Sequence, residues 1–209
     1  MSVFLCALMG YLVGCINPAY LMAKAKGFDI RQRGSGNAGA SNAVITLGKK
    51  AGAASAVFDV FKAYIVAKTA GLIFPGVALA NELAAASCIL GHIYPLPMGF
   101  RGGKGLACLG GTILAFNSHL FLILLMVELL LAFVVNYICI VPITASIIFP
   151  MLYLFFTGSL GGTLLFSLVS AVMLMKHIEN LHRIRKGTEA RFSFLWNKEE
   201  EIERLQNHM

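Results

Sequence analysis

The side chains of this sequence that can do chemistry gather in three short polar segments. The first segment, residues 34–42, combines glycines with hydroxyl and amide donors. Glycines let backbone N–H groups approach a ligand closely, and successive N–H groups form a nest that binds anions. A helix that begins near Ala40 adds a favourable dipole to such a nest. The residues that we expect to contact a substrate there are Gly34, Ser35, Gly36, Asn37, Gly39, Ser41 and Asn42.

The second segment, residues 100–105, places Lys104 after two glycines and directly before an apolar stretch. A lysine on such a turn holds a phosphate group as a point charge. We expect the substrate contacts of this segment to be Arg101, Gly102, Gly103 and Lys104. His92 is either a further substrate contact or a helix-end histidine bonded to a backbone carbonyl.

The third segment continues an apolar stretch, and its polar side chains have helical spacing. His177 and Asn180 lie three residues apart, so they share one face of a helix. Arg183 and Gly187 extend this face, and Glu189 follows at the end of the helix. An imidazole and two donors directed at one point are typical of a ligand site.

Each segment also has a structural alternative. The first segment is otherwise a plain flexible loop, since no Gly-Lys-Ser or Gly-Lys-Thr follows it as in a nucleotide-binding loop. The second and third are otherwise basic anchors at a membrane surface. An anchor explains Arg101 as well as a phosphate site does, but it explains poorly the glycines that surround Lys104.

Other titratable residues lie within apolar stretches. Asp59 and Lys62 are one helical turn apart, and a structural ion pair is favoured over a substrate role. Glu128 is alone among apolar residues and is either protonated or paired with a residue that the sequence does not identify. The five cysteines lack the paired spacing of a metal site and are expected to be free thiols. We expect no metal and no cofactor.

The composition is that of a membrane protein with several spans. Only 13% of the 209 residues are charged, against about 25% in soluble domains. Lysines and arginines flank the three polar segments, which by the positive-inside rule places all three on the cytoplasmic side. A basic rim also attracts anionic lipid headgroups. We expect membrane lipids as partners and no nucleic acid, since the basic residues lack an aromatic stacking platform.

The apolar stretches predict an all-α bundle of about seven transmembrane helices. We expect the N-terminus outside, the C-terminus in the cytoplasm, and residues 25–51 as a cytoplasmic loop. A short, solvated, charged helix is expected in the tail after Arg191. The predicted spans are residues 2–24, 52–74, 77–95, 106–117, 119–135, 138–156 and 160–178.

Together the three segments resemble the motifs of a known enzyme family. The sequences are Gly-Ser-Gly-Asn-x-Gly-Ala-Ser-Asn at 34–42, Gly-His-x-x-Pro at 91–95 with Phe-Arg-Gly-Gly-Lys-Gly at 100–105, and His-x-x-Asn-x-x-Arg at 177–183 with Gly-Thr-Glu at 187–189. In order and spacing they look like the three motifs of the bacterial acyl-phosphate:glycerol-3-phosphate acyltransferases. The Asp-x-x-Lys stretch at 59–62 is also similar to that family.

The resemblance implies a single integral membrane acyltransferase domain over residues 1–209, in the inner (cytoplasmic) membrane, with its site facing the cytoplasm. It implies transfer of a fatty acyl group from acyl phosphate to the 1-hydroxyl of sn-glycerol 3-phosphate, giving lysophosphatidic acid and phosphate, the first step of phospholipid biosynthesis. The catalytic residues would be Ser35, Lys104, His177 and Asn180. We expect the enzyme to work as a monomer.

Two positions depart from the pattern of this family. Members usually carry an arginine where this chain has Ile45, and many carry a serine where it has Pro142. These departures favour, as an alternative, a low-activity or inactive paralogue that binds lipid or partners. A small transporter of phosphorylated solutes is the rival from another class, but it needs polar residues along a path through the bilayer.

Overall fold

The computed structural model describes residues 1–206, and this part of the chain is built from α-helices joined by loops and short 3-10 turns. The predicted all-α class is therefore confirmed. The helices are α1 (Ser2–Gly14), α2 (Pro18–Ala25), α3 (Ala40–Leu47), α4 (Lys49–Ile73), α5 (Ala80–Ile93), α6 (Leu106–Phe116), α7 (Ser118–Val135), α8 (Ile140–Thr157), α9 (Leu160–Arg185) and α10 (Lys198–Gln206), and the 3-10 turns are η1 (Ile30–Gln32), η2 (Leu96–Met98) and η3 (Phe192–Leu195).

The first predicted span is broken, so a single helix over residues 2–24 is wrong. α1 and α2 meet at a bend of 43°. Asn17 precedes a proline, which disfavours the helical backbone, and it has extended dihedral angles instead. Its side chain accepts a hydrogen bond from the Tyr20 N–H at 2.9 Å and so caps α2, with Pro18 at the first helical position.

The predicted loop over residues 25–51 is also wrong in its second half, which is helical. α3 begins at Ala40, so the dipole of its N-terminus is available to the first segment, and α4 begins at Lys49. Gly48 joins the two helices with φ of 97°, a conformation that favours glycine. Gly52 allows α3 to pack on α4, because a Cβ there would lie 2.2 Å from Val44 Cγ2.

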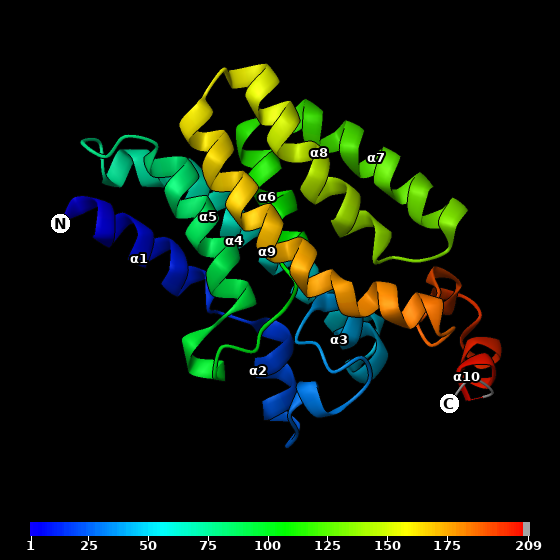
Figure 1. The fold of residues 1–209 in the computed structure, drawn as a ribbon. Helices are drawn as coiled ribbons and strands as arrows, with labels where there is room; N and C mark the ends of the chain where they lie inside the picture. Colours follow the sequence, from blue (N-terminus) through cyan, green and yellow to red (C-terminus); the bar gives the residue numbers. More distant parts are fainter. Residues whose placement is uncertain (207–209) are drawn as a thin grey trace.

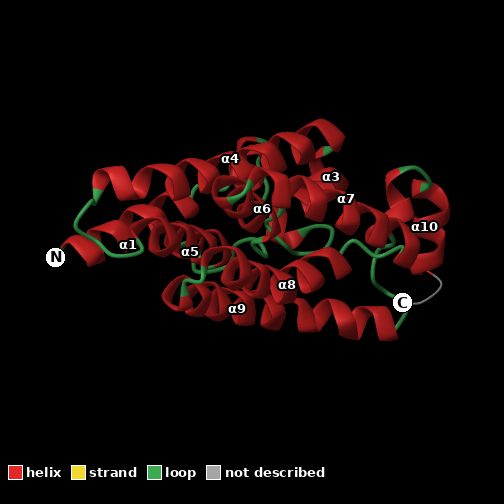
Figure 2. Cartoon of the chain, turned by 90° about the horizontal axis from the view of Figure 1, so that it is seen from above, coloured by secondary structure: helices red, strands yellow, loops and turns green. Residues whose placement is uncertain are grey.

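The helices of the bundle pack in pairs, α1 with α5, α4 with α6, and α8 with α9 (Figure 1). Seen from above, α4 and α9 lie on opposite sides of the bundle with α5 and α6 between them (Figure 2). Glycines bring α1 close to α5: a Cβ on Gly10 or Gly14 would lie 2.2 or 2.1 Å from a carbonyl oxygen of α5. Contacts of this kind are typical of helices that pack within a membrane.

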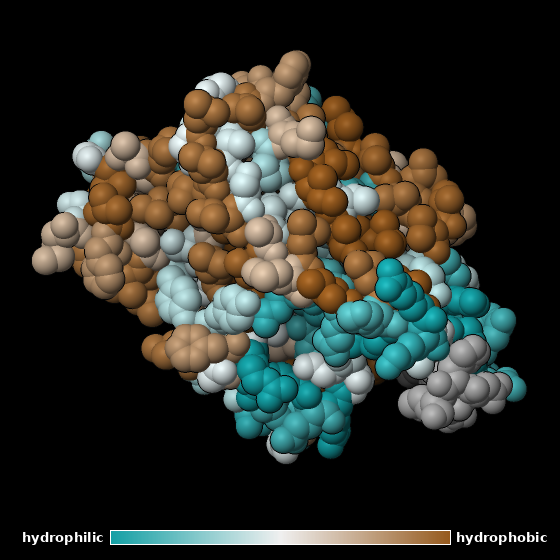
Figure 3. All heavy atoms as spheres, viewed as in Figure 1, coloured by the Kyte–Doolittle hydropathy of each residue, from teal (hydrophilic) through white to brown (hydrophobic). Residues whose placement is uncertain are grey.

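Three helices of the described residues, α7, α8 and α9, are long and apolar enough to cross a membrane, and the broken pair α1–α2 makes a fourth candidate. Their bounds agree with the spans predicted over 119–135, 138–156 and 160–178, although α9 continues to Arg185. α6 has only 11 residues. Hydrophilic residues gather at one end of the molecule, over α2, α3 and the C-terminal part of α9 (Figure 3).

Candidate active site

Lys104 meets the third polar segment across the bundle. It lies in the loop before α6, and its ammonium group donates a hydrogen bond to the side-chain oxygen of Asn180 on α9. The Asn180 amide nitrogen donates to Glu189 Oε1 at 2.6 Å, and Arg183 Nε donates to Glu189 Oε2 at 2.7 Å. We call Lys104, Asn180, Arg183 and Glu189 the Lys104 cluster. The structure thus unites residues of the second and third segments at one place.

The charges of the Lys104 cluster suit an anionic ligand. Two cations, Lys104 and Arg183, face one buried carboxylate, Glu189, which is 7% exposed. Arg183 also pairs with the exposed carboxylate of Glu179 at 2.9 Å. Partial burial of Lys104, together with the charge of Arg183, lowers the pKa of its ammonium group below 10.5. An incoming phosphate would lie beside the Lys104 ammonium and stabilise its charged form.

His177 lies one turn before Asn180 on the same face of α9, as its spacing predicts, and is 3% exposed. Its Nδ1 is 2.7 Å from the carbonyl oxygen of Met173. A carbonyl only accepts hydrogen bonds, so Nδ1 carries the proton and donates. In the neutral ring, Nε2 is then the nitrogen with a free lone pair, and its direction is fixed by the helix.

Within the first segment, Asn42 holds the loop together from inside. Its side-chain oxygen accepts the Ser35 N–H at 2.9 Å. Its amide group donates to the carbonyl oxygens of Ile30, Arg33 and Asn37 at 3.0, 3.0 and 2.7 Å. Asn42 is 0% exposed. The Asn42 side-chain groups that we expect to contact a substrate are therefore already hydrogen-bonded within the loop. Asn42 organises the loop of the first segment.

The remaining polar groups of the first segment face outward. Ser35 and Ser41 are exposed, and Asn37 is half-buried. Gly34 and Gly36 have φ of 60° and 73°, and a Cβ on Gly34 would lie 2.1 Å from Asn42 Oδ1. Gly39 is the N-cap of α3. The loop therefore needs its glycines in order to fold around Asn42 and leave the serines accessible.

The first and second segments are joined through the backbone. The Ala38 N–H donates to the Gly102 carbonyl at 3.4 Å, and the Asn17 side chain donates to the Ala38 carbonyl at 2.8 Å. The Arg31 guanidinium donates to the carbonyl oxygens of Met98 and Arg101. All three polar segments therefore lie at one end of the bundle, where Arg101 itself is exposed.

Arg31 and Asn17 were not identified as site residues from the sequence. Asp29 orients Arg31 through an ion pair of 2.7 Å. The hydrogen bond from Arg31 outweighs the opposing effect of burial and lowers the pKa of Asp29 to about 2. The sequence near each residue carries a local pattern. Asn17 precedes Pro18, which is typical of a helix cap, and Arg31 follows Asp29 by two residues, which favours an ion pair. Their partners in the second segment have no such signal.

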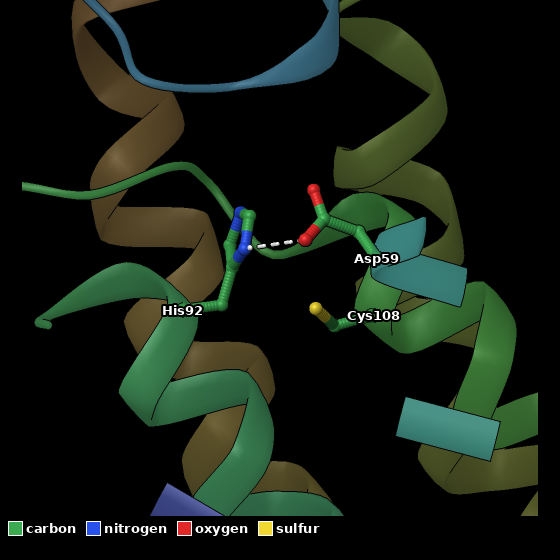
Figure 4. Close-up of side chains that lie close together, drawn as sticks. All are labelled: Asp59, His92 and Cys108. Carbon is green, nitrogen blue, oxygen red and sulfur yellow. Dashed lines mark ion pairs between the residues drawn. The ribbon is translucent and has the colours of Figure 1, made fainter. Parts of the chain in front are cut away.

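His92 is buried beneath the loop of the second segment, beside Asp59 (Figure 4). The ring is 3% exposed, and Nδ1 lies 3.3 Å from Asp59 Oδ1 and 3.2 Å from Lys62 Nζ. Gly103 lies over the ring, since a Cβ there would be 2.0 Å from His92 Nε2. The Gly103 N–H donates to the His92 carbonyl at 3.0 Å. The ring is bonded to charged side chains and not to a backbone carbonyl, so that alternative for His92 is wrong. The substrate contact stays a prediction, and the ring also supports the loop from its buried side.

The predicted Asp59–Lys62 ion pair is present at 2.7 Å, with both side chains buried. Lys62 Nζ also donates to the carbonyl oxygens of Gly14 and Ile16 at 3.0 and 2.6 Å. These carbonyls lie at the break between α1 and α2, where helical partners are missing. Cys108 approaches the same cluster as Asp59 and His92 (Figure 4), and Lys62 Nζ lies 2.7 Å from Asp59 Oδ1 and 3.2 Å from His92 Nδ1.

The other polar residues of the apolar stretches lie outside this site. Glu128 accepts a hydrogen bond from Thr144 Oγ1 at 2.6 Å, which identifies its partner. All five cysteines are free and buried, as expected. Ile45 is half-buried in α3, and Pro142 is buried in the first turn of α8, where proline is compatible with the helix.

Comparisons with known proteins give one consistent result. A family profile described as glycerol-3-phosphate acyltransferase matches residues 4–187. The glycerol-3-phosphate acyltransferase of Geobacter sulfurreducens is 36% identical over 194 residues, covering 88% of this chain and 94% of the relative. That of Aquifex aeolicus is 34% identical over 193 residues, covering 92% of this chain and 100% of the relative.

Two solved structures are also similar to this chain. The glycerol 3-phosphate form of PlsY, an integral membrane glycerol 3-phosphate acyltransferase, matches with a TM-score of 0.84 and 33% identity, covering 93% of this chain and 98% of that one. The lysophosphatidic acid form of PlsY matches with a TM-score of 0.80 and 33% identity, covering 93% and 97% of the two chains.

Proposed function

The chain belongs to the glycerol-3-phosphate acyltransferase family, and we propose that it transfers a fatty acyl group from acyl phosphate to the 1-hydroxyl of sn-glycerol 3-phosphate. The products are lysophosphatidic acid and inorganic phosphate. The observation that carries the proposal is the Lys104 cluster, in which two cations and an oriented amide lie beside glycine-rich loops at one end of an apolar bundle. Both substrates bring a phosphate group to such a site.

In this mechanism the 1-hydroxyl oxygen attacks the carbonyl carbon of acyl phosphate. A new ester C–O bond forms, the C–O bond to the phosphate breaks, and the departing phosphate takes the hydroxyl proton. Acyl phosphate is an activated mixed anhydride, so anchoring of both substrates and neutralisation of charge supply most of the rate enhancement. No cofactor and no metal take part.

The side chains divide this work between them. Lys104, Ser35 and Asn37 hold phosphate. His177, whose Nδ1 is committed to the Met173 carbonyl, orients glycerol 3-phosphate near the acyl carbonyl and leaves the hydroxyl proton to the phosphate. Asn180 joins Lys104 to the third segment. The backbone N–H groups of the glycine-rich loops add to these side-chain contacts with the substrates. The substrate contacts extend to Gly187 beyond α9.

The chain is further proposed to cross the inner membrane seven times as a monomer, with the N-terminus outside and the site in the cytoplasm. Basic residues around the polar end of the bundle support this orientation. α4 meets the requirements of a span once Asp59 and Lys62 neutralise each other. The acyl tail lies among apolar helices that are open to lipid. The concentration of hydrophilic residues at one end, on the face that Figure 3 shows, favours an enzyme over a transporter.

A direct assay tests the donor and the acceptor together. With purified protein and acyl phosphate, we expect release of phosphate only when glycerol 3-phosphate is present, with lysophosphatidic acid formed in equal amount. Acyl-CoA and acyl-carrier protein should give no product. Product from acyl-CoA at a comparable rate would contradict the proposed donor, and solute uptake into sealed vesicles without acyl transfer would favour the transporter.

Ile45→Arg restores the arginine that members of the resembled family usually carry at this position of α3. We expect the KM for glycerol 3-phosphate to fall roughly tenfold, because a charged hydrogen bond to phosphate contributes about 1.5–3 kcal/mol. Steady-state kinetics with glycerol 3-phosphate as the varied substrate measure this change. Ile45→Met, which keeps an apolar side chain of similar volume, is the control. An unchanged KM in Ile45→Arg would remove Ile45 as the mark of a weakened paralogue.

A further inference from the structure

The C-terminal helix α10 lies beyond the family match, which ends at residue 187. The sequence predicts a solvated charged helix here, and the helix is present. The prediction of full solvation is wrong for Glu201, which is 4% exposed, and the side chain of its partner Arg204 is only 14% exposed. Two charged groups of the tail are therefore withdrawn from water, which requires partners.

Arg204 finds those partners in the third polar segment. Its NH1 group donates to the Gly187 carbonyl at 2.5 Å, and its NH2 group donates to the Glu189 carbonyl at 2.7 Å. Because the guanidinium is a planar, rigid fork, these two bonds fix the relative positions of the two carbonyls. Arg204 thus holds the backbone of the turn that follows α9.

Glu201 in turn orients Arg204. It receives hydrogen bonds from Arg204 Nε at 2.8 Å and from Arg204 NH2 at 2.6 Å. The Arg191 N–H donates to the same carboxylate at 2.7 Å. Glu201 therefore joins α10 to the segment at Arg191 that follows the turn. The Arg204 guanidinium is held by Glu201 and by the two carbonyl oxygens of the turn.

The turn held by Arg204 carries a residue of the Lys104 cluster. Gly187 has φ of 71°, so the chain reverses there in a conformation that favours glycine. Glu189 follows, and its carboxylate accepts hydrogen bonds from Asn180 and Arg183. A carboxylate only accepts, so it selects the orientation of the Asn180 amide that presents nitrogen to Glu189 and oxygen to Lys104.

We propose that Arg204, oriented by Glu201, is a positioning residue of the acyl-transfer site. It fixes the Glu189 backbone, Glu189 fixes the Asn180 amide, and Asn180 fixes Lys104. This inference rests on the proposed function, since it assigns the catalytic placement of Lys104 and Asn180 to contacts from the C-terminal helix. The tail is part of the working enzyme rather than an appendage.

Arg204→Ala in the full-length chain tests the inference. We expect kcat for acyl transfer to fall roughly tenfold to 100-fold, because small displacements of a catalytic group have effects of this size. The KM for glycerol 3-phosphate should change less than threefold. Amide hydrogen exchange over residues 186–190 should accelerate. Arg204→Lys should retain part of the activity, since an ammonium reaches one carbonyl but lacks the fork.

Arg185→Ala is the matched control, because it removes the same charge at the exposed end of α9. It should match the parent in kcat and in exchange. A double-mutant cycle of Arg204→Ala with Glu189→Gln should be non-additive, as both changes release Asn180. Additive effects, or parent-like kcat in Arg204→Ala, would overturn the inference, as would parent-like exchange over residues 186–190. A parent chain without acyl transfer would count against the proposed function instead. The exchange measurement would still show whether Arg204 holds the turn at residues 186–190.

Discussion

Lys104→Ala is expected to lower kcat/KM for acyl transfer by about 10²- to 10³-fold, the size seen when one preorganised donor is removed from a developing anion. The ammonium group is the part of the second segment that reaches the third, through its hydrogen bond to Asn180. Its loss removes the point charge for phosphate and leaves the Asn180 oxygen without its donor. Release of phosphate and formation of lysophosphatidic acid measure the loss.

Lys26→Ala is the matched control for this change. It removes the same charge from the same polar end of the molecule, but Lys26 is exposed and outside the Lys104 cluster. Its kcat/KM should fall less than about fivefold, the range for a screened surface charge. Equal kinetics for Lys104→Ala and the parent would rule out the proposed site.

The pH profile of the parent adds a second measure of the same group. Burial and the charge of Arg183 place the pKa of Lys104 below 10.5. The charged form binds phosphate, so kcat/KM should decline as pH rises through this lowered pKa, earlier than for an ordinary lysine. The profile of kcat/KM reports the free enzyme, in which the cluster is as described. Because Arg183 is a cause of the shift, Arg183→Gln should move the decline to higher pH.

Lys62→Met is expected to destabilise the fold by about 3–5 kcal/mol, the usual effect of removing one member of a buried ion pair. The change leaves the Asp59 carboxylate buried without its cation. It also leaves the carbonyls of Gly14 and Ile16 without a donor at the break of the first span. Thermal unfolding of the purified protein in detergent measures the loss.

Two variants separate this effect from the general loss of a lysine. Lys68→Met removes an exposed lysine from the same helix and should leave the unfolding temperature unchanged. Asp59→Asn combined with Lys62→Met removes both charges and should recover part of the stability. Wild-type stability in Lys62→Met would show that the pair does not hold the broken helix.

Much of the site follows from spacing within one segment. His177, Asn180 and Arg183 were placed on one face because helical periodicity puts them there, and the ion pair of Asp59 with Lys62 follows from the same rule. Such features depend on neighbours in sequence, so the local pattern is enough to predict them.

Contacts between distant segments could not be predicted in this way. The Asn42 side chain has the same donors whether it faces a ligand or its own loop, and only the folded turn decides between the two. The position of His92 beneath Gly103 depends on how α5 meets the loop before α6. Arg204 binds carbonyl oxygens, which every residue carries, so no sequence pattern marks its target.

The short helix α6 has a consequence for where the substrates meet. Its 11 residues measure about 16 Å, roughly half of the ~30 Å hydrocarbon thickness. As one of the seven proposed spans, α6 would not reach both interfaces of an undeformed bilayer, so the lipid beside it would be thinned or one end submerged among acyl chains. Hydrophobic mismatch at this helix would shorten the distance between the aqueous boundary and the fatty tails. The proposed water-soluble acceptor and lipid-soluble donor would then react without either leaving its own phase completely.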